Sequence, residues 1–139
     1  MNRRTILYAA PAVVALLLLA ACQSTSAPTE MKEVASAIAG AMKITIESPS
    51  GELAQGKNQF RMKFQTADGK PADPGTVTVS SSMSMPGMAP MVAPIELSPI
   101  ATGEYKLDGT FDMSGAWVFD VRWNSPAGQG SSTIHLSVR

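Results

Sequence analysis

Apolar and polar residues alternate along most of the chain after residue 41, a pattern typical of β-strands that turn one face toward a core. The alternation predicts seven strands, centred on residues 42–46, 60–64, 77–79, 95–97, 105–107, 117–123 and 134–138. Clusters of Gly, Pro, Ser and Asp lie between these runs and are expected to form turns. The number and spacing of the strands predict an all-β fold, an immunoglobulin-like β-sandwich, as one domain over residues 42–139.

Residues 31–42 have a weaker pattern. Four apolar residues recur there at helical spacing, namely Val34, Ala35, Ile38 and Met42. Because small alanines dominate this segment and Gly40 interrupts it, only a short, marginal helix is expected. Residues 23–30 have too little apolar surface to fold and are predicted to be a flexible tether.

The N-terminus has the order of a secretory signal, with two arginines before an uncharged apolar run that ends at Cys22. This run stops short of the roughly 20 apolar residues of a membrane-spanning helix. The sequence Leu19-Ala20-Ala21-Cys22 resembles the lipobox of bacterial lipoproteins, which implies cleavage before Cys22 and lipidation of its sulfur, with acyl chains such as palmitate. The alternative is an ordinary signal peptide followed by a stray cysteine. We therefore expect a signal peptide over residues 1–21, and the lipidated cysteine, tether and marginal helix over residues 22–41.

Charge and cysteine content limit the disulfides and the binding partners that are expected for this chain. Cys22 is the only cysteine, so a lipidated chain has no thiol left for a disulfide. Removal of residues 1–21 takes away two arginines, so 11 basic and 11 acidic groups become 9 and 11. Without a basic patch, binding of nucleic acid is not expected. We expect a lipid-anchored protein on the extracytoplasmic side of the inner or the outer membrane, with an envelope protein as a possible partner.

A methionine-rich segment is the most unusual feature of the composition. Four methionines fall within nine residues, namely Met83, Met85, Met88 and Met91. Thioethers are soft, neutral ligands that suit Cu(I), whereas harder ions prefer carboxylate or imidazole. The two prolines of the segment favour a polyproline-type backbone with a repeat of three, which would turn the last three methionines to one side. Methionine is also a flexible core filler, and Met83 and Met85 continue the inward face of the preceding strand, so packing alone is the alternative explanation.

Strand direction adds a further candidate ligand. If consecutive strands run antiparallel, the methionine-rich segment, Met113 and the C-terminal end of the last strand lie at one pole, where Trp117 begins a strand. Met113 is therefore a candidate ligand, and the Trp117 ring is a candidate contact for the cation. The simplest explanation for Trp117 and Trp123 is a place in the core. His135, the only histidine, falls on the polar face of its strand, where an exposed residue is a simpler explanation than a ligand.

No pairing of a nucleophile with a base is recognisable, so an enzyme is not expected.

Several motifs together resemble the YtkA-like domain, which is also found under FixH-family labels. They lie at residues 85–91, 103–105, 111–117, 121–123 and 126–128. The resemblance covers most of residues 42–139 and implies a small all-β module of an exported or membrane-linked bacterial protein, often in settings concerned with copper or other heavy metals.

The resemblance also implies a metal-related binding or accessory role, with Met85, Met88, Met91 and Met113 on matching motif positions. The chain departs from FixH proper in having a lipid anchor in place of a membrane helix and no histidine within the methionine-rich segment. Two functions are therefore expected. The first is handling of a soft metal, Cu(I), through Met83, Met85, Met88, Met91 and Met113. The alternative is a structural or protein-interaction module of the cell envelope without a metal.

Overall fold

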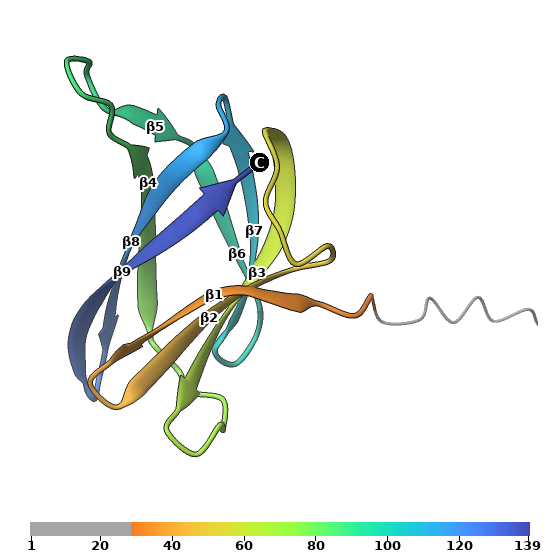
Figure 1. Cartoon of the computed structure of the whole chain (residues 1–139). Helices are drawn as coiled ribbons and strands as arrows, with labels where there is room; N and C mark the ends of the chain where they lie inside the picture. The colour runs from red at the N-terminus through yellow and green to blue at the C-terminus, as the bar shows by residue number, and fades with distance from the viewer. Residues whose placement is uncertain (1–28) are drawn as a thin grey trace, which may run out of the picture.

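The alternating segments form nine strands in the computed structural model, which describes residues 29–139 (Figure 1). The strands are β1 (Lys32–Ala39), β2 (Met42–Ser48), β3 (Gly56–Thr66), β4 (Thr76–Met83), β5 (Met91–Ala93), β6 (Ile95–Ala101), β7 (Glu104–Phe111), β8 (Gly115–Ser125) and β9 (Gly128–Val138). Five of them form one sheet in the order β1-β2-β3-β7-β6, and four form a second sheet in the order β5-β4-β8-β9. Neighbouring strands in both sheets are antiparallel, and the two sheets pack as a sandwich. The predicted all-β sandwich is thereby confirmed.

The seven predicted strands are all present, and the structure adds β1 and β5. β5 has only three residues, which is too few for an alternating pattern to be recognised. Pro94 alone separates β5 from β6, and these two strands belong to different sheets. The chain therefore crosses from one sheet to the other at Pro94, a residue that has no N–H to donate to a strand ladder.

The predicted helix over residues 31–42 is wrong, because most of this segment forms β1. β1 pairs with β2 in a register that places Ala37 opposite Ile44. Val34 and Ala35, at the bulge of β1, and then the alternate residues Ala37 and Ala39 are half-buried against the core. The edge of β2 supplies backbone partners along the whole of β1, and this pairing outweighs a weak helix propensity. The sandwich therefore begins at Lys32 and not at Met42.

The core lies between the two sheets and is formed by the inward residues of both. Its centre is aromatic. The Phe60 and Phe119 rings are 5.8 Å apart between centroids, and those of Phe111 and Trp117 are 5.1 Å apart. Trp117 and Trp123 are buried, as predicted, and His135 is exposed on the outer face of β9, also as predicted.

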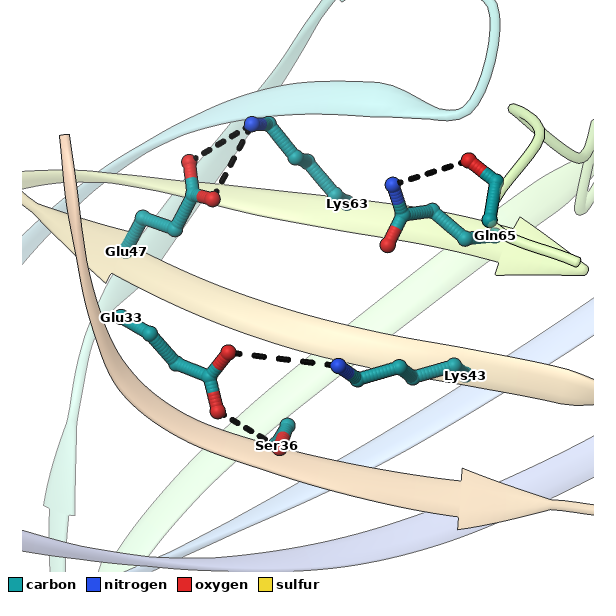
Figure 2. Close-up of polar contacts among 7 residues, drawn as sticks. Glu33, Ser36, Lys43, Glu47, Lys63 and Gln65 are labelled. Atoms are coloured by element: carbon teal, nitrogen blue, oxygen red, sulfur yellow. Dashed lines mark hydrogen bonds and ion pairs between the residues drawn. The ribbon is translucent and has the colours of Figure 1, made fainter. Parts of the chain in front are cut away.

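The outer face of the five-stranded sheet is covered by paired charges. Lys63 on β3 lies 2.9 Å from a carboxylate oxygen of Glu47 on β2, and both side chains are largely shielded from solvent (Figure 2). Lys43 and Glu33 form a looser pair, at 4.0 Å, between β2 and β1. These charges are matched within the sheet, so this face presents no large patch of one sign.

Residues 29–139 contain no helix, and so none that is long and apolar enough to cross a membrane. The predicted signal peptide over residues 1–21, the lipidated Cys22 and most of the predicted tether lie outside the described residues.

Candidate metal site at the methionine pole

The methionine-rich segment connects β4 and β5 as a hairpin that extends beyond the end of the sandwich (Figure 1). Met83, the last residue of β4, is directly opposite Met91, the first residue of β5. Directly opposed residues of an antiparallel pair have Cβ atoms about 4.5–5.5 Å apart on the same face of the sheet. The two thioethers therefore start side by side, although they are eight positions apart in the sequence.

The tip of the hairpin is a β-turn. The Met88 N–H donates to the Met85 carbonyl oxygen at 3.2 Å, and Pro86 and Gly87 occupy the two central positions. Gly87 has a φ of +77°, which is favourable for glycine and fits the third position of a type II turn. The predicted polyproline repeat is therefore not formed.

This turn separates the methionines that the predicted repeat would have turned to one side. Met88 lies at the tip with 66% of its surface exposed. Met85 and Met91 are half-buried and pack against the core, and Met83 is buried with 5% of its surface exposed. Met83, Met85 and Met91 therefore form an inward group, and Met88 stands apart from it.

Met113 approaches the same region from the connection between β7 and β8. It is 41% exposed. The Met83 sulfur lies beside Gly115, at the start of β8, where a Cβ would be 3.0 Å from that sulfur. Gly115 also pairs with Val138 near the C-terminus. The predicted common pole is thereby confirmed, and we call this end of the sandwich the methionine pole: the β4–β5 hairpin, the β7–β8 turn and the end of β9.

Trp117 lies in the core next to the turn that holds Met113. Its indole N–H donates to the Met113 carbonyl oxygen at 3.0 Å, and its ring meets Phe111 edge to face. Only 1% of the residue is exposed. The ring is enclosed by the core and presents no face to the surface of the pole, so contact between this ring and a cation stays a prediction. Trp117 fixes the backbone of the turn that holds Met113.

The close approach of Met83 to Gly115 is a structural feature of the candidate site that the sequence pattern did not predict. Gly115 leaves room for the Met83 thioether, because any side chain there would crowd the sulfur. The only sign of this contact in the sequence is a glycine directly before the alternating residues of β8. The residue that it contacts, Met83, lies far away in the sequence. His135 pairs in register with Val118 and points away from the core. Within residues 29–139 no three or more His, Cys, Asp or Glu residues gather as a metal-binding group.

An open groove of about 760 Å³ lies at the opposite pole, between the β1–β2 turn and the β8–β9 hairpin. Its lining includes Ile38, which is 79% exposed, and the edge of Trp123. A large exposed isoleucine beside a buried indole gives this groove an apolar part away from the methionine pole.

The chain is similar to one known protein family. The YtkA-like family profile matches residues 36–122, from within β1 to within β8. No curated protein matches the chain. The matched segment covers more than half of the sequence and most of the sandwich, and the chain therefore belongs to the YtkA-like family.

Proposed function

We propose that this chain binds Cu(I) at the methionine pole, as a lipid-anchored protein on the extracytoplasmic side of a membrane. The observation that carries the proposal is the direct opposition of Met83 and Met91 across the β4–β5 pair. Met85 follows Met83 by two residues and is also packed inward. Three soft donors thus start from neighbouring backbone positions.

The chemistry of this group suits a monovalent soft ion. Thioethers are neutral, so they offer little to Zn(II) or Cu(II), whose preferred ligands are imidazole and carboxylate. Partial burial strengthens this preference, because a harder dication would have to lose water without gaining charged ligands. Met113, in the β7–β8 turn that leads to Gly115, is the candidate fourth donor.

Met88 has a separate role in this proposal. It is exposed at the tip of a hairpin that projects from the sandwich, whereas the inward group is shielded (Figure 1). We assign it the first contact with an incoming ion or with a metal-carrying partner. Loss of Met88 should therefore slow delivery of the metal more than it weakens the final complex.

The proposed anchor is compatible with this arrangement. Residues 22–31 join the lipidated cysteine to β1, and ten residues span at most about 35 Å when fully extended. This length lets the sandwich move over the membrane surface and meet an envelope partner. The proposal is one of binding and transfer, and it includes no catalytic step.

Titration of the mature chain with Cu(I) under reducing conditions tests the proposal. The triple variant Met83→Leu, Met85→Leu, Met91→Leu keeps volume and apolarity, at a cost usually below about 1.5 kcal/mol per swap. We expect it to fold and to bind Cu(I) at least about tenfold more weakly, a difference of about 1.4 kcal/mol. Circular dichroism checks the fold of each variant.

Met42→Leu is the matched control, because Met42 is half-buried like Met85 but lies beside the groove at the opposite pole. Its affinity for Cu(I) should equal that of the parent. Equal affinity of the triple variant and the parent would show that the methionines only fill space.

If the methionines only fill space, a second function is favoured instead. The exposed Ile38 and the groove beside it favour a protein-interaction module of the envelope without a metal.

A further inference from the structure

The edge of β4 is only partly covered. β5 pairs with the last three residues of β4, Ser81 to Met83. The preceding residues, Thr76–Ser80, pair with β8 on one side. On their other side no strand of residues 29–139 pairs with them. We call Thr76–Ser80 the free edge, because its backbone N–H and C=O groups on that side have no strand partner.

The two edge strands of the five-stranded sheet, β6 and β1, carry features that hinder pairing with a further strand. β6 contains Pro99 and an irregular register beside it. β1 has a bulge between Glu33 and Ala35 and lies alongside β9. Proline, bulges and covering segments are the usual means by which proteins protect a strand edge.

The free edge contains no proline and no bulge, and β4 contacts β6 of the other sheet without forming a ladder with it. The free edge consists of Thr, Val and Ser, with no charge, and its β-branched residues favour extended structure. Val77 and Val79 are only half-buried, so the sandwich is incompletely closed along this side. An uncharged, regular edge of this kind is expected to pair with another strand.

We propose that the free edge is the interface of a symmetric dimer, in which Thr76–Ser80 of two copies pair antiparallel about a two-fold axis at Thr78. In this arrangement Thr76 faces Ser80 of the second copy, Val77 faces Val79, and Thr78 faces itself. Hydroxyl pairs and β-branched pairs are favourable across antiparallel strands. A two-fold interface must be self-complementary, and this segment meets that condition at each of its positions.

The structure also limits the length of strand that is available for this pairing. At one end Ser81 is occupied by β5, and at the other end the chain turns away at Gly75. Gly75 has a φ of +70°, and a Cβ there would come within 2.2 Å of the Asn124 carbonyl oxygen. Pairing is therefore confined to Thr76–Ser80, whose centre is Thr78. A second copy suits this window better than a different protein, because the edge offers no charge that would select an unlike partner.

Cysteine cross-linking of the full chain in its membrane tests this dimer independently of any metal. Antiparallel neighbours have Cα atoms about 4.5–5.5 Å apart, within the range of about 4.4–6.8 Å that a disulfide spans. We expect Thr78→Cys to form a disulfide-linked dimer under mild oxidation, detected on a non-reducing gel. The unmodified chain shows any background from Cys22, which is its only cysteine.

Ser131→Cys is the matched control, since Ser131 lies in the same row of the sheet as Thr78 but on β9, the opposite edge strand, which β1 lies alongside. It should cross-link several-fold less than Thr78→Cys. The register is tested by co-expression of Thr76→Cys with Ser80→Cys, which should cross-link more strongly than either variant alone. A monomeric Thr78→Cys, a yield no higher than that of Ser131→Cys, or linkage only to a different protein would each overturn the proposal.

Discussion

At the scale of single residues, the fold depends on a few glycines at close backbone contacts. Gly103, between β6 and β7, has a φ of +70°. A Cβ on it would lie 2.3 Å from the Ala72 carbonyl oxygen and 2.8 Å from that of Phe64. The Gly103 carbonyl oxygen accepts a hydrogen bond from the Phe64 N–H at 2.7 Å. The turn therefore lies directly against the end of β3, with no space for a side chain.

Gly103→Ala should lower the free energy of unfolding by at least about 2 kcal/mol, because it adds a backbone clash to an unfavourable φ. Gly40→Ala is the control, since Gly40 also has a positive φ, +63°, but has open space around its Cβ position. That variant should lose only about 1 kcal/mol. Urea unfolding of both variants measures the difference, and equal losses would show that crowding at Gly103 is unimportant.

At the scale of elements, the pattern of apolar residues predicted most strands correctly but did not predict β1. The alternation of large apolar residues located β2, β3 and β7 correctly, because their inward positions are filled by Ile, Met, Phe, Tyr and Leu. β1 has mostly alanine at its half-buried positions, and alanine favours a helix when no partner strand is considered. Only the neighbouring edge of β2 decides its conformation, and that contact is not visible in a local pattern.

β1 should contribute measurably to stability, since it covers the edge of β2 and lies alongside β9. A fragment of residues 42–139 should be less stable than residues 29–139 by at least about 2 kcal/mol, through lost burial of Val34 and the alanines and lost strand pairing. Urea midpoints of the two fragments test this expectation. Equal midpoints would mean that β1 is an accessory strand and that the sandwich is complete from Met42.

At the scale of the whole molecule, the antiparallel order of the strands alone predicted that the methionine-rich segment and Met113 share one pole. The inward or outward position of each methionine could not be predicted in the same way. It depends on a turn at Pro86 and Gly87, and on space left by Gly115 in a distant strand. Antiparallel order is a property of the topology, whereas exposure of a thioether depends on contacts between segments far apart in the sequence.

The attachment of the whole molecule to a membrane is the expectation that rests on Cys22. Cys22→Ala removes the only sulfur that a lipid could modify as a thioether, so the chain should lose incorporation of a fatty-acid probe. Cell fractionation should then recover it away from the membranes. Met31→Ala, a change at the far end of the proposed tether, serves as the control and should remain attached. Probe incorporation by Cys22→Ala would contradict the anchor.

The hydrogen bond from the Trp117 indole to the Met113 carbonyl oxygen has one more consequence. It joins a natural fluorophore to the turn that carries an exposed methionine, while the second indole, Trp123, lies beside the groove at the opposite pole. Replacement of Trp123 by phenylalanine would leave Trp117 as the sole source of tryptophan emission. The wavelength and intensity of that emission would then report movements of the turn that holds Met113, in a protein without an added label.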